Sequence, residues 1–348
     1  MTIKIFSKKI GINHPTFIIA EISANHNQSL SKAYKIIAGA AKAGVDAIKL
    51  QTYTADTMTV KSHSNKSLIK NKRSPWNGEN LYKLYKKGST PWHWHKKLFL
   101  YAKKLGLIAF STPFDSSSLD FLETLKVPLY KISSFEVTDI PLLKKVAATK
   151  KPVILSTGMA NLSEISEAIK TLKKNGCKEI VLLKCTSSYP TKFSDVNLLT
   201  IPALRKKFNC QVGLSDHTVG EISAITSVGL GSSVIEKHIT INKKNSLDGS
   251  FSLDLDELKN FVKNLRIAKK CLGRINFEPT FDEKQNLKYR RRIVAKKEIK
   301  KNEKFTEENI ICLRGVKGLL PKFYSKIINK KSKKNIRSNQ PIRKNHYI

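Results

Sequence analysis

QVGLSDHT, residues 211–218, is a short apolar run that ends in four polar side chains, one of them a histidine. SVIEKHIT (233–240), about twenty residues later, has the same form, with a glutamate, a lysine and a second histidine near its end. A buried strand usually leads into a turn rich in glycine, asparagine or proline. Two successive strands that lead instead into charged side chains and imidazoles indicate a chemical site at one edge of a sheet.

Six further apolar runs resemble these two, and they are mostly continuous, as strands buried on both faces are. In chain order the eight runs are FIIAEI (17–22), AIKLQT (47–52), LIAFST (107–112), LYKISS (129–134), PVILST (152–157), EIVLLKCT (179–186), QVGLSDHT (211–218) and SVIEKHIT (233–240). Helical patterns follow the strands, over residues 31–43, 92–105, 116–125, 140–148, 162–175, 197–208, 221–230 and 254–272. This alternation predicts a (β/α)₈ TIM barrel. An open doubly wound sheet is the alternative, disfavoured because the chain has no G-x-G-x-x-G motif.

Active-site residues of such a barrel lie at the C-terminal ends of its strands. Almost every run ends in a hydroxyl, a lysine or a carboxylate: Glu21, Lys49, Gln51, Ser111, Thr112, Lys131, Ser133, Ser134, Glu136, Ser156, Thr157, Lys184, Thr186, Ser215, Asp216, His217, Glu236, Lys237 and His238. One lysine in an apolar run is usually a surface residue with a buried stem. Four strands with such a lysine near the same end favour a site for phosphate or carboxylate.

The two imidazoles, His217 and His238, come from neighbouring strands, with Glu21 and Asp248 available near them. This donor set suits a borderline divalent metal, Mn²⁺ first, with Co²⁺ or Mg²⁺ as alternatives. The chain has no nucleophile elbow, Walker loop or cofactor fingerprint. The residues alone therefore predict a metal-dependent barrel enzyme that acts on a phosphorylated or carboxylated small molecule.

The bulk composition is strongly basic, with 64 Lys and Arg against 27 Asp and Glu and a formal charge of +37. A nucleic-acid-binding protein built on an inactive barrel would explain the charge. However, the lysines run along the whole chain and no nucleic-acid-binding motif accompanies them, so we expect neither nucleic acid nor membrane as a partner. Five scattered cysteines without a C-x-x-C pair, and no apolar span of transmembrane length, favour a cytoplasmic location.

Two regions depart from the barrel repeat. The connection 52–91 is too long for a simple βα loop, so we expect it to fold over the barrel mouth and to bring Tyr53, Trp76, Tyr82 and Tyr85 there. After Gly273, a charged connector leads into a lysine-rich segment too small to be stable alone. We therefore expect a barrel over 1–275, a linker over 276–290 and a small docking domain over 291–348.

Ten motifs carry a family resemblance: AEISANHNQ, DAIKLQTYTADTMT, STPFD, YKISSFE, LSTGM, LLKCTSSYPT, VGLSDHT, VIEKH, KKEIKKNEKFTEENI and GLLPKFY. They resemble the sialic acid synthase family, specifically its pseudaminic acid synthase branch, in order along nearly the whole chain. The resemblance implies a TIM barrel followed by a small antifreeze-like (SAF) domain. It also implies condensation of phosphoenolpyruvate with an amino-hexose, here 2,4-diacetamido-2,4,6-trideoxy-altrose, to a nonulosonic acid with release of phosphate. N-acetylneuraminate or legionaminate synthase is the alternative.

Site residues follow from the resemblance, motif by motif. The implied substrate-binding residues are Lys49, Thr112, Lys131, Ser134, Ser156, Ser187, Tyr189, Ser215 and Arg314. The implied metal ligands are His217 and His238, and the implied catalytic residues are Glu21, Glu136, Asp248 and His217. In this family the small domain caps the partner's barrel, which implies a domain-swapped homodimer in which Arg314 reaches the sugar. Ser187, Asn302, Asn329 and the stretch RGVKGL around Arg314 depart from the sialic-acid pattern.

Overall fold

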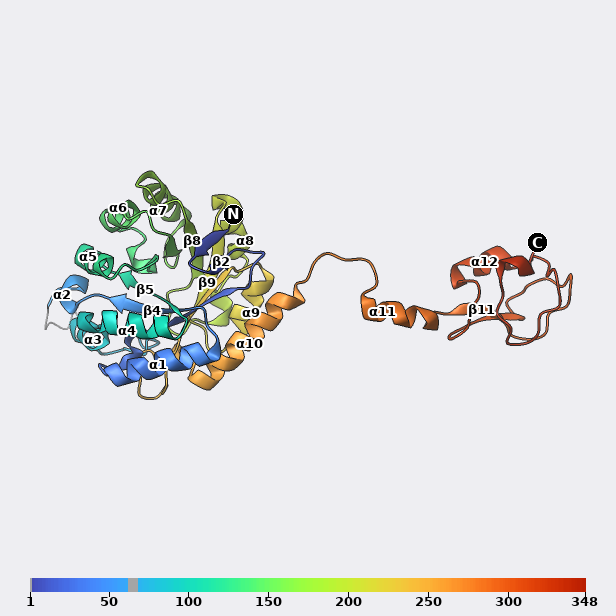
Figure 1. Cartoon of the computed structure of the whole chain (residues 1–348), viewed down its shortest axis with the longest axis horizontal. Helices are drawn as coiled ribbons and strands as arrows, with labels where there is room; N and C mark the ends of the chain where they lie inside the picture. The colour runs from blue at the N-terminus through green and yellow to red at the C-terminus, as the bar shows by residue number, and fades with distance from the viewer. Residues whose placement is uncertain (1, 62–67) are drawn as a thin grey trace. The chain divides into compact units, whose positions relative to one another are not determined.

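The structure, a computed structural model, describes residues 2–61 and 68–348 and divides into two compact units, Met1–Gly273 and Arg274–Ile348 (Figure 1). The first unit contains a closed barrel of parallel strands in the order β10-β3-β4-β5-β6-β7-β8-β9. These strands are β3 Phe17–Glu21, β4 Ala47–Thr52, β5 Ile108–Pro113, β6 Tyr130–Ile132, β7 Val153–Ser156, β8 Ile180–Cys185, β9 Gln211–Asp216 and β10 Val234–His238. The main helices are α1 Leu30–Ala43, α4 Trp92–Lys104, α5 Ser116–Thr124, α6 Ile140–Ala148, α7 Leu162–Lys174, α8 Thr200–Phe208, α9 Ile222–Gly229 and α10 Leu255–Cys271. The predicted (β/α)₈ barrel is confirmed.

Residues of each barrel strand alternate between the lumen and the surrounding helices. The part of the lumen toward the N-terminal ends of the strands is apolar, and it is filled by Phe17, Ile19, Ala47, Phe110, Leu129, Ile154, Val181, Leu183 and Val234. The outward positions pack against the helices in a larger cluster that includes Ile18, Ile48, Leu182, Val212 and Ile235. At the C-terminal end, the positions of lumen parity become polar: Glu21, Lys49, Thr112, Lys131, Ser156, Cys185, Ser215 and Glu236. The strand pattern thus brings the functional side chains to one end of the lumen.

An N-terminal hairpin that the sequence did not predict closes the opposite end. It consists of β1 Ile3–Ile5 and β2 Lys8–Ile10, and its three isoleucines join the lumen cluster. The buried Asp46 carboxylate ties this end together, because it lies 2.8 Å from Lys8 Nζ and 2.6 Å from Arg266 Nη2. This end of the barrel is therefore sealed by packing and ion pairs.

The long connection between β4 and α4 contains two short helices, α2 Ala55–Met58 and α3 Leu81–Gly88. Its residues 62–67 lie outside the described part of the chain. The segment is attached to the barrel loops at two points: Trp76 Nε1 donates to the Leu247 carbonyl at 2.9 Å, and Gln28 Nε2 donates to the Lys87 carbonyl at 3.0 Å. The first contact connects the insertion to the loop that follows β10, and the second connects it to the loop that follows β3.

The second unit has its own small core. Its helix α11 spans Phe281–Asn286, β11 Arg292–Ala295 pairs with β12 Ile310–Leu313, and α12 spans Tyr324–Ile327. The core residues are Ile293, Ala295, Ile299, Phe305, Ile310, Leu319, Ile327, Ile336 and Ile342. Asn302 and Asn329, which stand where the family pattern has turn glycines, both have a left-handed φ, of 69° and 65°. Asparagine tolerates this conformation better than most residues, so it can occupy these turns.

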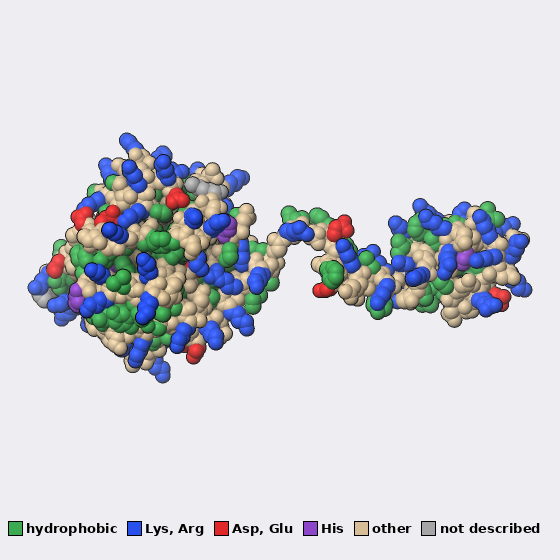
Figure 2. Space-filling view, in the orientation of Figure 1, with side chains coloured by type: hydrophobic (Ala, Val, Ile, Leu, Met, Phe, Trp, Pro, Cys, Tyr) green, Lys and Arg blue, Asp and Glu red, His purple; other side chains and the backbone are tan. Residues whose placement is uncertain are grey.

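The basic residues are distributed over the surface. Figure 2 shows lysine and arginine side chains on each unit, separated by neutral and hydrophobic ones rather than gathered in one stripe. In the described residues, no helix is long and apolar enough to cross a membrane.

Candidate active site

A cavity of about 860 Å³ opens at the C-terminal end of the barrel. Inward-facing strand residues, among them Lys49, Lys131 and Ser215, form its floor. Its walls come from the loops after the strands and from the described part of the insertion between β4 and α4. The cavity therefore joins the polar end of the lumen to the loops where barrel enzymes place their substrates.

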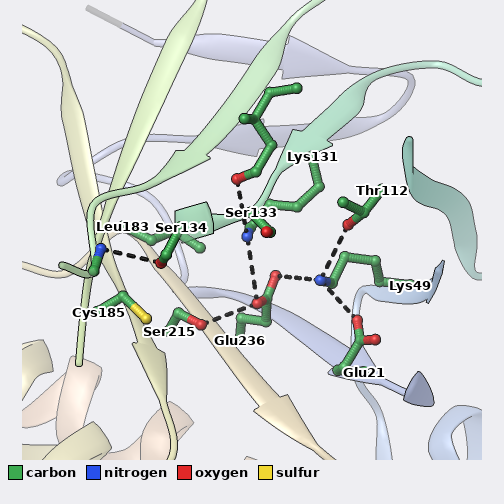
Figure 3. A network of polar contacts seen from close by, with 12 residues as sticks. Glu21, Lys49, Thr112, Lys131, Ser133, Ser134, Leu183, Cys185, Ser215 and Glu236 are labelled. Atoms are coloured by element: carbon green, nitrogen blue, oxygen red, sulfur yellow. Dashed lines mark hydrogen bonds and ion pairs between the residues drawn. The ribbon is translucent and has the colours of Figure 1, made fainter. Parts of the chain in front are cut away.

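Lys49 is the first of two buried lysines on this floor (Figure 3). Its Nζ lies 2.8 Å from Glu21 Oε2 and 3.4 Å from Glu236 Oε2, and it donates to Thr112 Oγ1 at 3.4 Å. Glu21 and Thr112 are fully buried and lie against Lys49 rather than on the cavity surface. They therefore fix the position of the ammonium group that faces the cavity.

Glu236 joins the second lysine to the first. Its Oε1 lies 3.7 Å from Lys131 Nζ and accepts a hydrogen bond from Ser215 Oγ at 3.0 Å. Burial alone would raise the pKa of Glu236, but the charges of Lys131 and Lys49 outweigh it and lower the pKa to about 2. Burial raises the pKa of Glu21 to about 7 despite the opposing charge of Lys49. Burial lowers the pKa of Lys131 despite the charge of Glu236. A bound anion would hold both lysines protonated, so two lysines beside one strongly acidic carboxylate suit an anionic ligand.

Serine hydroxyls surround the lysines. Ser134 Oγ accepts a hydrogen bond from the Gly158 amide at 3.0 Å, so its own proton can be donated into the cavity. Ser156 Oγ is buried and has no hydrogen-bond partner among the described residues. A side chain at Gly158 would collide with Ser134 and Ser187, whose Oγ atoms would lie 2.7 and 2.3 Å from its Cβ. The glycine therefore keeps these hydroxyls accessible.

The two histidines stand together beside this floor. The ring centroids of His217 and His238 are 5.3 Å apart in an edge-to-face arrangement. His217 Nδ1 lies 3.1 Å from the Thr186 carbonyl oxygen, which assigns the proton to Nδ1 and leaves the Nε2 lone pair available. His238 Nδ1 is buried without a hydrogen-bond partner among the described residues, 3.8 Å from Asp248 Oδ2. Burial lowers the pKa of His238 well below its usual value, so this imidazole is neutral.

These features fit a divalent metal. Imidazoles from two adjacent strands are suitable ligands for Mn²⁺ or a related ion, and an unpartnered buried nitrogen such as His238 Nδ1 is what a ligand position requires. Burial would lower the pKa of His217, but Cys185 beside it raises that pKa, so only His238 is held neutral by its surroundings. Within residues 2–61 and 68–348, however, no third His, Cys, Asp or Glu completes a preformed cluster with them. Glu21, expected near the metal, is ion-paired with Lys49. The described residues thus offer two candidate nitrogen ligands, with Asp248 as the nearby carboxylate.

An aromatic wall covers the histidines. Tyr189 packs against His217 with 4.5 Å between ring centroids, and Phe251 packs against His238 at 4.9 Å. Trp76 of the insertion contacts both, at 5.4 Å from Tyr189 and 6.1 Å from Phe251. The upper cavity therefore offers apolar ring faces beside polar groups, as a site for a partly apolar sugar would.

The structure brings most of the predicted site residues together. The cavity is lined by Lys49, Lys131, Ser134, Glu136, Ser156, Ser187, Tyr189, Ser215, His217, His238 and Asp248. Arg314 lies in the second unit, where it is exposed. The four strand-end lysines do not act alike: Lys184 and Lys237 have the opposite parity to the lumen residues and are absent from the lining. The prediction that all four strand-end lysines contribute to one anion site is therefore wrong for Lys184 and Lys237.

Glu236, Cys185 and Trp76 are among the lining residues that were missing from the predicted site. Glu236, which contacts both floor lysines, was noted only as a strand-end charge, although its place two residues before His238 shares the lumen parity. Cys185 Sγ lies 3.9 Å from His217 Nδ1, and although burial would raise its pKa, His217 lowers the pKa to about 6. Trp76 was named as an aromatic of the insertion, but no periodic pattern there could have placed its ring.

A closed (β/α)₈ barrel with paired lysines and paired imidazoles at its mouth defines a barrel enzyme for small anionic substrates. A protein-family model described as the NeuB family matches residues 36–276, and a model described as the SAF domain matches residues 290–348. The chain belongs to the NeuB family of nonulosonic acid synthases, and it ends in a SAF domain.

Individual relatives agree with this family. The pseudaminic acid synthase of Helicobacter pylori is 43% identical over 333 residues, which cover 94% of this chain and 96% of that protein. The N,N'-diacetyllegionaminic acid synthase of Campylobacter jejuni is 39% identical over 94% of this chain and 99% of that protein. Among solved structures, the N-acetylneuraminic acid synthetase of Leptospira borgpetersenii, in complex with citrate, has a TM-score of 0.73 and 32% identity over 82% of this chain and 95% of that chain.

Proposed function

We propose that the protein is a pseudaminic acid synthase. It condenses phosphoenolpyruvate with 2,4-diacetamido-2,4,6-trideoxy-altrose to a nine-carbon nonulosonic acid and releases phosphate. The observation that carries the proposal is the floor of Lys49, Lys131 and Glu236 directly beside two imidazoles, in a chain 43% identical to a pseudaminic acid synthase. The 39% identity to a legionaminate synthase keeps that enzyme, with N-acetylneuraminate synthase, as the alternative.

Phosphoenolpyruvate carries a carboxylate and a phosphate, and the floor offers matching donors. Lys49 and Lys131 supply two ammonium groups, and Ser134, Ser156 and Ser215 supply hydroxyls. Thr112 acts through its hydrogen bond to Lys49. Such charge-assisted contacts in a buried site are strong and hold the enol carbon in a fixed position.

His217 and His238 would hold the divalent ion, Mn²⁺ in our proposal, with Co²⁺ or Mg²⁺ as alternatives. When bound, the ion supplies Lewis-acid polarisation of the sugar's aldehyde oxygen. The Thr186 carbonyl and the Tyr189 and Phe251 rings orient the two imidazoles for this role.

The reaction forms a carbon–carbon bond and a bond between C2 and the oxygen of water, and it breaks the bond between C2 and the phosphate oxygen. The C3 carbon of phosphoenolpyruvate attacks the aldehyde carbon, water adds to the cationic C2, and the tetrahedral intermediate expels phosphate. Burial raises the pKa of Asp248, which suits it to give a proton to the aldehyde oxygen. Burial also raises the pKa of Glu136, which can take the proton of the attacking water. Glu21, with a pKa of about 7, can exchange a proton beside Lys49.

The aromatic wall supports the choice of sugar. C6 of the proposed altrose derivative is a methyl group, whereas C6 of N-acetylmannosamine is a hydroxymethyl group. Phe251, Tyr189 and Trp76 offer ring faces to such a methyl group, and the loop 245–258 that carries Phe251 resembles the pseudaminic branch. An apolar wall favours the methyl and disfavours an unpaired hydroxyl.

We further propose a homodimer with swapped domains, in which Arg314 of one subunit reaches the sugar in its partner. Large apolar side chains are exposed on the βα loops at the mouth end of the barrel: Phe135, Met159, Phe193 and Val219. Residues 276–290 would be the linker and 291–348 the docking domain. Phe277 and Phe281 in the linker, and Ile275 just before it, are 80 to 95% exposed, as expected of a segment that packs against another chain. The five unpaired cysteines support a reducing, cytoplasmic location.

Phosphate release tests the function directly. The purified protein is given phosphoenolpyruvate and Mn²⁺ with each candidate hexose, and phosphate is expected only when the altrose derivative, or more slowly a related hexose, is present. Lys131→Met should abolish turnover, whereas Lys145→Met, which removes a surface lysine paired with Asp120, should not. Absence of hexose-dependent phosphate release with every candidate sugar would refute the proposal.

A further inference from the structure

A second ion pair lies directly behind the histidines, on the outward face of the same two strands. Lys237 of β10 and Asp216 of β9 are cross-strand partners, with 2.8 Å between Lys237 Nζ and Asp216 Oδ2. Each side chain is only 1% exposed. Neither residue lines the cavity. A buried ion pair contributes little net stability compared with apolar residues of the same volume, so its presence calls for another role.

The hydrogen bonds of this pair converge on Thr218. Asp216 Oδ1 accepts from the Thr218 amide at 2.9 Å and from Thr218 Oγ1 at 2.8 Å. Lys237 Nζ donates a short hydrogen bond to the Thr218 carbonyl oxygen. The pair therefore holds Thr218 at both its amide and its carbonyl.

The chain neighbours of these residues are the two imidazoles. His217 lies between Asp216 and Thr218, so both of its flanking residues are fixed by the ion pair. His238 follows Lys237, and its own carbonyl is held by the Leu253 amide at 2.9 Å. One buried contact thus constrains the backbone beside each histidine.

We propose that Asp216 and Lys237 are positioning residues for the metal site: their ion pair sets the backbone so that His217 and His238 face the same ion. This inference rests on the proposed function, in which the two imidazoles hold a divalent metal. Outer contacts that orient metal ligands typically change metal affinity by about 10- to 100-fold when they are lost.

The test is the double variant Asp216→Asn with Lys237→Met in the full-length protein. It removes both charges at nearly constant volume, so no unpaired buried charge remains, but it releases the Thr218 carbonyl. We expect Mn²⁺ to bind about 10- to 100-fold more weakly, by titration calorimetry or electron paramagnetic resonance. Phosphoenolpyruvate binding should stay within about twofold of wild type, because Lys49 and Lys131 face the lumen.

A matched control exists at the other end of the barrel. Asp46→Asn with Arg266→Met removes the charges of another pair, 2.6 Å apart, in which Asp46 is buried and the Arg266 side chain is 28% exposed. This pair lies far along the strands from the histidines. This control should bind Mn²⁺ as wild type does. Thr218→Val, which removes only the hydroxyl contact to Asp216, is a milder variant that keeps the test available if the double variant does not fold. It should bind Mn²⁺ a few-fold more weakly.

The outcomes separate the two proposals. If wild type binds Mn²⁺ and the folded double variant, or otherwise Thr218→Val, binds it equally well, the positioning role is overturned and the proposed function stands. An equal loss of Mn²⁺ and phosphoenolpyruvate binding would mean general disorder and would also overturn it. If wild type binds no Mn²⁺, the metal assignment itself fails, and this inference with it.

Discussion

The geometry of the cavity floor predicts that Glu236→Gln lowers the stability of the protein. The carboxylate is shared by two lysines, at 3.4 Å from Lys49 Nζ and 3.7 Å from Lys131 Nζ. Glutamine keeps the shape and can still accept the hydrogen bond from Ser215. Lys49 retains Glu21 at 2.8 Å, whereas Lys131 retains no carboxylate within ion-pair distance among the described residues. The substitution therefore leaves one buried ammonium group uncompensated.

The size of the effect can be worked out in two ways. Removing one partner of a buried ion pair costs about 3–5 kcal/mol. The pKa of Glu236, about 2 against an ordinary 4.5, corresponds to about 3 kcal/mol of interaction with the ionised form. For a barrel of this size, where about 1 kcal/mol shifts the Tm by roughly 2 °C, the Tm should fall by about 6–10 °C.

Thermal unfolding with and without phosphoenolpyruvate is the assay. Lys131, freed from Glu236, should pair with the ligand, so phosphoenolpyruvate should raise the Tm of Glu236→Gln by more than that of wild type. Asp120→Asn, which breaks a surface pair with Lys145, is the control and should cost less than about 1 kcal/mol. The stability difference should persist above about pH 4.5 and disappear as the pH falls toward 2, because only ionised Glu236 contributes it. An unchanged Tm in Glu236→Gln at pH 7 would refute the reasoning.

Three further predictions concern pH, sugar and assembly. His95 is buried in α4, where its Nε2 lies 2.8 Å from Thr52 Oγ1. Burial lowers the pKa of His95 to about 4, so its neutral form contributes stability above pH 6.5 that is lost as the pH falls through 4. His95→Gln should make the decline of Tm between pH 6.5 and 4 shallower, and an unchanged decline would contradict this. N-acetylmannosamine should have a kcat/KM about one to two orders of magnitude below that of the altrose derivative, because an unpaired hydroxyl against the aromatic wall costs about 1–3 kcal/mol. Equal kcat/KM values for the two sugars would overturn the branch assignment. A mixture of the inactive variants Arg314→Ala and His217→Ala should recover, after subunit exchange, the activity of about a quarter of the wild-type sites. Half of random dimers are mixed, and each mixed dimer has one intact site. No recovery of activity would exclude the swapped dimer.

The fold was largely predictable because parallel barrel strands are continuous apolar runs. The run 47–52, for example, matches β4 Ala47–Thr52. The N-terminal hairpin was missed because β1 and β2 have only three residues each. Their isoleucines are core residues only because they pack against the barrel lumen, which the local sequence does not reveal. Short elements stabilised by distant packing leave little local signal.

The sequence predicted which strand ends carry the site residues, but it did not predict which of those side chains face the lumen and which face outward. A strand buried on both faces carries no alternation that separates lumen from exterior. Lys49 and Lys237 therefore look alike in sequence, although one faces the cavity and the other forms an outward pair with Asp216. The role of Glu236 depends on the register that sets it opposite Ser215, and this register exists only in the closed barrel.

The most direct test of the central claim follows the bridging oxygen of phosphoenolpyruvate. The protein is incubated with Mn²⁺, the altrose derivative and phosphoenolpyruvate labelled with ¹⁸O between C2 and phosphorus, and both products are analysed by mass spectrometry. Our account predicts equal amounts of nonulosonic acid and phosphate, with the label in the phosphate, because the carbon–oxygen bond breaks. Label retained in the sugar acid, or phosphate released without a nonulosonic acid, would contradict it.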